Sequence, residues 1–211
     1  MYKTILLDID GTILDSEKVL LSALQESIRD TIGLKTNFKD LEVTIGMREE
    51  EVSRLFTDNT FEQKKIITQW SNNIKNTKNR AQLFPHVEST LFNLKKNGVE
   101  LGIVTSKTDL HMENDFNYLG INKYFSVIVT SDNVINPKPH PEPLELAIKK
   151  IETNKNETLY VGDSIFDFYC AKNAGVDFAL ATWGAKDDDK LYNNSIILND
   201  FKDILDFAYK I

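Results

Sequence analysis

Short apolar stretches alternate with amphipathic stretches along most of this 211-residue chain. The apolar stretches are rich in Ile, Leu and Val without polar alternation, which is typical of parallel strands buried on both faces. The stretches between them carry apolar residues at helical spacing, as at Val87, Leu91 and Leu94 before Gly98. Repeated strand–helix–strand units predict an α/β fold with a doubly wound, mostly parallel sheet. The predicted strands span residues 4–8, 101–105, 126–130, 158–163, 178–181 and 195–198.

Residues 16–80 break this alternation. They show helical patterns and no convincing strand, and Leu20, Leu24 and Ile28 recur on one helical face. An insertion of about 65 residues is far longer than an ordinary crossover between parallel strands. We therefore expect an all-helical cap domain inserted after the first strand of the core. The predicted domains are an α/β core of residues 1–15 and 81–211 and a helical cap of residues 16–80.

Two features mark borders of this insertion. Segments 14–16 and 80–83 are expected to link the cap to the core. A long cap helix is expected near Thr60, because Thr60 and Gln63 match a capping box ahead of an apolar helical stripe.

Composition and charge narrow the class of protein. With 41% hydrophobic and 27% charged residues, the chain is an ordinary globular sequence. A net charge of −7 and no basic cluster exclude a nucleic-acid partner. No apolar run is long enough to span a bilayer, Asp8 and Asp10 interrupt the first one, and the single Cys170 permits no internal disulfide. We expect a soluble cytoplasmic protein with no membrane or nucleic-acid partner.

The first predicted strand ends in an acidic cluster. Asp8 and Asp10 stand two residues apart, so they project to one side of the strand end, and Gly11 permits a sharp change of direction. Two carboxylates this close resist joint ionisation unless a cation lies between them or one of them is protonated. The alternative interpretation is a simple turn, because Asp-Gly between apolar runs is a strong hairpin signal.

Three more polar clusters follow predicted strands. Thr105 and Ser106 offer hydroxyls that could bind a phosphate oxygen, although a hydroxyl there is also a common helix N-cap. Prolines flank Lys138, which is either a restrained ammonium or part of a rigid surface loop. Asp163 and Asp167 stand four residues apart and would share one face of a helix, where acidic residues also favour the helix dipole. All four clusters lie where open parallel sheets bind ligands.

These clusters share the order and spacing of a known motif set. The four motifs are Asp8-x-Asp10-Gly11-Thr12, Thr105, Lys138 and Gly162-Asp163-x-x-x-Asp167. In this respect the chain resembles the haloacid dehalogenase superfamily, in the branch with a helical cap after the first strand. Its nearest look-alikes are phosphoglycolate phosphatases and related sugar-phosphate phosphatases. The resemblance implies a Rossmann-like core and a phosphatase acting on a small phosphorylated metabolite.

The resemblance also implies roles for individual residues. Asp8 would be the nucleophile that forms an aspartyl-phosphate, and Asp10 the general acid and then base. Thr105, Ser106 and Lys138 would bind the transferring phosphoryl group. Phosphoryl transfer depends mainly on alignment and charge neutralisation, for which an ammonium is suited.

The implied cofactor is Mg²⁺. Its ligands would be the Asp8 carboxylate, the Asp10 backbone carbonyl, Asp163 and Asp167, the last directly or through water. Hard oxygen ligands suit Mg²⁺, and a phosphate dianion approaching so many carboxylates would otherwise be repelled.

Two alternatives to a phosphatase remain open. The phosphomutase branch of the superfamily carries a histidine in its first cap helix, where this chain has Val19, Leu20 and Leu21. A signalling receiver or a non-catalytic binding module on a similar sheet is the alternative from another class. The oligomeric state is expected to be a monomer or weak homodimer.

The cap loop is the expected specificity element. Gly46 matches the family's cap loop, and Arg48 could reach a second anionic group on the substrate. The alternative is that Arg48 begins a helix and pairs with a nearby glutamate. His111, His140 and Cys170 are expected to be incidental, since no histidine cluster indicates a transition metal.

Overall fold

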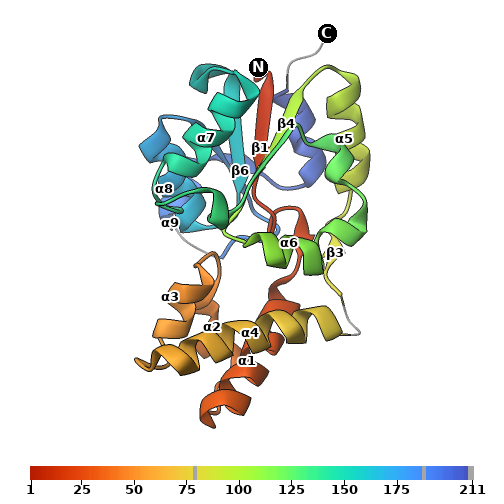
Figure 1. Ribbon diagram of the computed structural model, residues 1–211. Coiled ribbons are helices and arrows are strands. Elements are labelled where there is room, and N and C mark those ends of the chain that lie inside the picture. Colours follow the sequence, from red (N-terminus) through yellow and green to blue (C-terminus); the bar gives the residue numbers. More distant parts are fainter. Residues whose placement is uncertain (78–79, 187–188, 209–211) are drawn as a thin grey trace.

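A computed structural model describes residues 1–77, 80–186 and 189–208. Its centre is a six-stranded sheet in the order β5-β4-β1-β6-β7-β8, in which every neighbouring pair is parallel (Figure 1). The predicted α/β fold and its six strands are confirmed. The strands are β1 Thr4–Leu7, β2 Leu14–Asp15, β3 Gln82–Leu83, β4 Glu100–Val104, β5 Val127–Val129, β6 Thr158–Gly162, β7 Asp177–Ala181 and β8 Ile196–Leu198.

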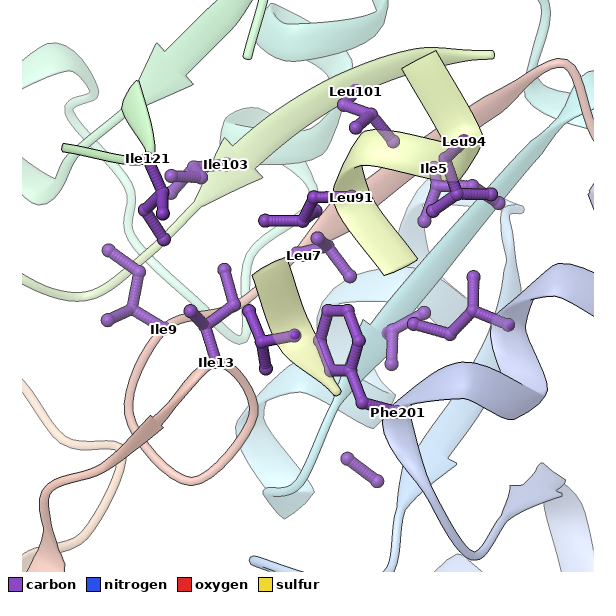
Figure 2. Close-up of a cluster of buried hydrophobic side chains, with 14 of the residues drawn as sticks. Ile5, Leu7, Ile9, Ile13, Leu91, Leu94, Leu101, Ile103, Ile121 and Phe201 are labelled. Atoms are coloured by element: carbon purple, nitrogen blue, oxygen red, sulfur yellow. The ribbon is translucent and has the colours of Figure 1, made fainter. Parts of the chain in front are cut away.

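Helices cover both faces of this sheet, and each face buries its own apolar cluster. One cluster packs Leu91 and Leu94 of α5 and Phe201 against strand residues such as Ile5 and Leu7 (Figure 2). The other face packs against α7 and α8. The helices are α1 Glu17–Ile32, α2 Phe38–Leu41, α3 Glu49–Arg54, α4 Thr60–Asn76, α5 Val87–Lys96, α6 Asp109–Asp115, α7 Glu142–Ile151, α8 Ile165–Ala174 and α9 Asp189–Asn194.

The helices α1 to α4 lie together beyond one end of the sheet (Figure 1). They bury a separate apolar cluster that includes Leu24, Ile28, Ile66 and Trp70. The chain leaves the sheet through β2 and returns through β3, and these two strands pair antiparallel. We refer to α1–α4 as the helical unit. No helix in the described ranges is both long and apolar enough to cross a membrane.

Two helix starts differ from the sequence-based expectation. The capping box at Thr60 and Gln63 is wrong, because the side chain of Asn59 accepts hydrogen bonds from the backbone of Phe61 and Glu62 instead. The helix after Thr105 is capped by Thr108, whose hydroxyl accepts from the backbone of His111. The hydroxyl of Thr105 is therefore not used as a helix cap.

Candidate active site

Parallel pairing brings the predicted site residues to one edge of the sheet. Strand β1 pairs with β4 on one side and β6 on the other, so Asp8, Thr105 and Asp163 each follow the last residue of adjacent strands. This is the strand arrangement expected at a topological switch point. A cavity of about 230 Å³ lies there, between the sheet and the helical unit. Its lining includes Asp8, Asp10, Thr105 and Asp163 from the sheet side, and Gly46 from the helical unit.

A tight loop after β1 aims its acidic residues. The backbone carbonyl of Ile9 accepts from Ile13 and Leu14, which curls the chain immediately behind Asp8. Gly11 takes a φ of +76°, a left-handed conformation that other residues adopt only with strain. A Cβ at Gly11 would overlap the carboxylate of Asp163, so the glycine also makes room for that side chain.

Lys138 is buried behind the nucleophile candidate. Its ammonium donates to Asp8 Oδ1 at 2.9 Å, to Asp167 Oδ1 at 2.7 Å and to the hydroxyl of Tyr160 at 3.1 Å. Lys138 is 4% exposed, so the surface-loop interpretation is wrong for this lysine. Desolvation opposes its charge, but the two carboxylates outweigh it and raise the pKa of the lysine. Asp8 is therefore fixed beside a permanent positive charge.

Three buried carboxylates form a cluster with too little positive charge. Ligand oxygens of Asp8, Asp163 and Asp167 lie within 4.8 Å of one another. Burial, reinforced by Asp167 and Asp10, raises the pKa of Asp8 to about 7, although Lys138 opposes the shift. Burial and the neighbouring Asp167 and Asp8 raise the pKa of Asp163 well above its ordinary value. Either a bound cation or a retained proton would relieve this excess of negative charge, and the three carboxylates could hold a metal ion. All-oxygen donors of this kind suit Mg²⁺.

Asp167 differs from its two neighbours because its hydrogen bonds outweigh its burial. Although burial opposes ionisation, Lys138 and the hydroxyls of Ser164 and Tyr160 lower its pKa. Asp163 lies before α8 and Asp167 within its first turn, so the predicted shared helical face is wrong. The two carboxylates still converge, since their ligand oxygens lie within 4.8 Å of each other.

Asp10 lies apart from this cluster, on the cavity wall. Its Oδ1 accepts from Ser16 Oγ at 2.5 Å, and its Oδ2 lies 3.0 Å from the ammonium of Lys107. Lys107 is 5% exposed and also pairs with Asp115 at 2.6 Å. The position of Asp10 is thus fixed by the start of the helical unit and by a buried lysine.

The remaining predicted residues lie in different places. The hydroxyl of Ser106 donates to the carbonyl of Gly46, so it links the sheet edge to the loop of the helical unit. Gly46 lines the cavity and has a φ of +80°. Arg48 is not among the lining residues; it precedes α3, and its Nε lies 3.6 Å from Glu50 Oε2. That position matches the helix-start alternative.

Several residues that shape the site were given no role from the sequence. Lys107 directly follows the Thr105–Ser106 pair, and this adjacency is the signal that could have found it. Nothing in the sequence distinguishes Tyr160 from the other residues of its apolar strand. Its role is visible only in the structure, where its hydroxyl contacts Lys138 and Asp167. His111 lines the cavity and is not an isolated side chain.

Comparisons with known proteins identify the family of the chain. The family of haloacid dehalogenase-like hydrolases matches residues 5–181. The chain belongs to that family. It is 32% identical to the pyrophosphatase PpaX of Oceanobacillus iheyensis over 207 residues, which are 96% of this chain and 95% of that one.

Solved structures extend the likeness to the fold of the whole chain. A provisionally named phosphoglycolate phosphatase from Lactobacillus plantarum superposes with a TM-score of 0.88 at 26% identity, covering 98% of this chain and 99% of that one. A predicted phosphoglycolate phosphatase from Haemophilus somnus gives 0.85 at 27% identity, covering 98% and 97%. The chain is thus a phosphatase of this family, and the receiver-module alternative is wrong.

Proposed function

We propose that this enzyme is a Mg²⁺-dependent phosphatase that hydrolyses a small phosphate monoester through an aspartyl-phosphate on Asp8. The observation that carries the proposal is the position of Asp8. Its carboxylate lines the cavity, lies 2.9 Å from the ammonium of Lys138 and shares a buried cluster with Asp163 and Asp167. A nucleophile needs access to the substrate and a nearby positive charge that neutralises the incoming phosphate. The cavity supports the first requirement, and the ammonium of Lys138 supports the second.

The proposed reaction has two half-steps. A carboxylate oxygen of Asp8 attacks phosphorus while the bond to the leaving oxygen breaks, and Asp10 gives its proton to that oxygen. Asp10 then accepts a proton from a water molecule that attacks the aspartyl-phosphate, which releases phosphate and restores Asp8. The bonds to Ser16 and Lys107 hold Asp10 at the cavity wall, where a leaving group would lie. Thr105 would bind a phosphoryl oxygen from the end of β4.

We assign the metal to Asp8, Asp163 and Asp167, with the backbone carbonyl of Asp10 as a further ligand. Mg²⁺ bound there would neutralise phosphate charge and orient the phosphoryl group for in-line attack. The raised pKa values of Asp8 and Asp163 support a cation at this point, because burial without one disfavours their charged forms.

The helical unit is the proposed cap. Residues 16–80 would form the cap domain, and residues 1–15 and 81–211 the core. Its own apolar cluster and its two connections to the core through β2 and β3 support this division. A cap over the cavity would exclude water from the phosphoryl group and select the leaving group. We further propose a cytoplasmic enzyme that is a monomer or a weak homodimer.

Two classes of substrate are candidates. The first class is the phosphate monoesters. The motif resemblance indicates phosphoglycolate or a sugar phosphate, and the names of two structural relatives indicate phosphoglycolate. Pyrophosphate, which is an anhydride and not a monoester, is the alternative candidate, because the 32%-identical relative is named a pyrophosphatase. Phosphomutase activity is disfavoured, since Leu20 and Leu21 present apolar side chains to the cavity where that branch has a histidine.

The Asp8→Asn variant tests the covalent route. With Mg²⁺ present, the wild-type enzyme is expected to turn over p-nitrophenyl phosphate and acetyl phosphate, and EDTA is expected to remove this activity. Asp8→Asn keeps the side-chain volume but removes the nucleophile, so turnover is expected to fall by at least about a thousandfold. Phosphate release measured at saturating substrate gives the comparison.

Asp30→Asn is the matched control, because Asp30 is an exposed carboxylate on α1 that pairs with Arg29 away from the cavity. It is expected to retain wild-type activity. If Asp8→Asn keeps more than a few per cent of the activity while its circular dichroism is unchanged, the covalent assignment is wrong.

A further inference from the structure

The nitrogen-bearing side chains that line the cavity are almost all engaged by partners. Lys107 pairs with Asp10 and Asp115, Lys186 pairs with Glu17, and the indoles of Trp70 and Trp183 donate to the backbone carbonyls of Leu20 and Thr12. The exception among the described lining residues is His111. Its Nε2 is buried and has no hydrogen-bond partner there. Arg48 Nε is also buried without one, but Arg48 does not line the cavity.

His111 belongs to a buried pair that crosses from the core to the helical unit. It lies on α6, which faces α4 at the end of the sheet (Figure 1). Its Nδ1 is 2.9 Å from Oε1 of Glu49, the first residue of α3. His111 is 4% exposed and Glu49 is 8% exposed, and both line the cavity. An acid and an imidazole this deeply buried need a specific reason, because burial penalises each charge.

The contacts fix the orientation of the imidazole ring. The ionised carboxylate of Glu49 can only accept hydrogen bonds, so Nδ1 carries the proton that it donates. The hydroxyl of Thr108 donates to the same Glu49 oxygen at 3.2 Å, and the ring of Trp70 packs edge-on at 6.1 Å from the imidazole centroid. A carboxylate on one ring nitrogen both sets the tautomer and stabilises the protonated imidazolium. Nε2 is then the free nitrogen of an oriented ring, and it donates a hydrogen bond only when it also carries a proton.

We propose that His111, oriented by Glu49, donates a hydrogen bond from Nε2 to a second anionic group on the leaving portion of the substrate. This inference rests on the proposed phosphatase function and extends it to the substrate class. The second group is an acidic oxygen, which a carboxylate or a second phosphate would supply equally. His111 is a substrate-binding residue, and Glu49 is a positioning residue.

The charges around the cavity favour an anionic partner for this nitrogen. The ammonium groups of Lys107 and Lys186 already pair with carboxylates, whereas Nε2 of His111 has no hydrogen-bond partner among the described residues. The carboxylate that pairs with the His111 ring is Glu49, and it also accepts from Thr108. An anion at Nε2 would accept a hydrogen bond from a ring that carries a proton on both nitrogens, and would complete the hydrogen bonding of that ring. Glu49 is on the helical unit, so the contact forms only while that unit covers the sheet edge.

The test compares two substrates that differ in one group. 2-Phosphoglycolate carries a carboxylate where ethyl phosphate carries a methyl group. Pyrophosphate is a third substrate, in which the second anionic group is a phosphate. The variant is His111→Phe, which keeps an aromatic ring beside Trp70. It is expected to lower kcat/KM for 2-phosphoglycolate or for pyrophosphate by about tenfold or more, and for ethyl phosphate by less than about threefold. The substrate that loses kcat/KM in the variant, 2-phosphoglycolate or pyrophosphate, shows whether the group at Nε2 is a carboxylate or a phosphate.

Glu49→Gln tests the positioning role, since glutamine retains the shape but not the charge. The same selective loss is expected, mainly as a rise in KM. Asn114→Ala is the control for a merely structural contact, because Asn114 donates to Ser71 across the same boundary without touching the cavity. It is expected to change all substrates equally and slightly.

Three results would overturn the inference. Equal losses on all substrates in His111→Phe would make the pair a structural link. An equal loss on 2-hydroxyethyl phosphate and 2-phosphoglycolate would show that Nε2 serves a neutral hydroxyl and not an anion. An absence of Mg²⁺-dependent turnover of every phosphate compound by the wild-type enzyme would remove the proposed function, and this inference with it.

Discussion

Gly11 shows how much of the site depends on one missing side chain. Gly11→Ala is expected to lower phosphatase turnover by about a hundredfold, because its Cβ would displace the Asp163 carboxylate and small misplacements at reacting centres are costly. The left-handed φ of +76° adds a backbone cost of about 1 kcal/mol to the folded state. Turnover and urea denaturation, measured on one preparation, separate the two effects.

Gly33→Ala supplies the control for the backbone cost. Gly33 ends α1 with a φ of +71°, and no heavy atom lies within 4 Å of the position that an added methyl group would take, so it shares the strain without the overlap. It is expected to lose about the same stability and to keep its activity. Similar activity losses in the two variants would mean that strain, and not the displaced carboxylate, explains the result.

The position of a residue could be predicted where it directly follows a strand that the sequence reveals. Asp8 and Asp163 each follow a buried apolar run, so strand pairing alone brings them together. The pairs Lys107–Asp115 and Glu49–His111 depend instead on how α6 is placed, and in the second pair on how the helical unit docks. The pattern of apolar residues along the chain does not indicate how the helical unit docks on the core. The sequence therefore gave no reason to assign His111 a role.

At the scale of elements, the start of α4 can be tested directly. Asn59→Ala is expected to lower the free energy of unfolding by about 1 kcal/mol, because the Asn59 side chain accepts from the backbone of both Phe61 and Glu62. Thermal or urea denaturation of the two proteins gives the difference.

Thr60→Ala is the comparison variant, because Thr60 is the first residue of α4 and not its cap. It is expected to change stability by less than about 0.5 kcal/mol. A larger loss in Thr60→Ala than in Asn59→Ala would restore the capping box expected from the sequence.

The elements themselves were predictable because their signals are local. Unbroken Ile, Leu and Val runs identify strands buried on both faces, and each of the six appears within a residue or two of its predicted bounds. The exact start of α4 was not predictable in this way. Asn59 and Thr60 are both favourable capping residues, and only the extended φ and ψ of Asn59 decide between them.

For the whole molecule, the buried acidic cluster predicts that the metal-free protein becomes less stable as pH rises. Burial first, and then Asp167 and Asp10, raise the pKa of Asp8 from 3.8 to about 7. A raised folded-state pKa means that the folded protein holds a proton that the unfolded chain has lost, so this contribution to stability is present below about pH 4 and is lost as pH rises to about 7. The pKa of Asp167 is lowered from 3.8, so its contribution to stability changes only below about pH 4. It therefore does not offset the loss of stability between about pH 4 and 7.

Mg²⁺ should reverse this loss, because it binds the ionised carboxylates of the folded protein. Urea denaturation of EDTA-treated protein is expected to give a lower free energy of unfolding at pH 7.5 than at pH 5. Mg²⁺ at a hundred times its dissociation constant is expected to restore about 2.7 kcal/mol at pH 7.5 and less at pH 5, where protons compete with the metal. Asp163→Asn removes one carboxylate from the cluster, so its metal-free form should lose less stability over this pH range and gain little from Mg²⁺. A wild-type protein whose stability ignores Mg²⁺ at pH 7.5 would place the cation elsewhere, and the repulsion between Asp8, Asp163 and Asp167 would then have to be relieved by proton uptake alone.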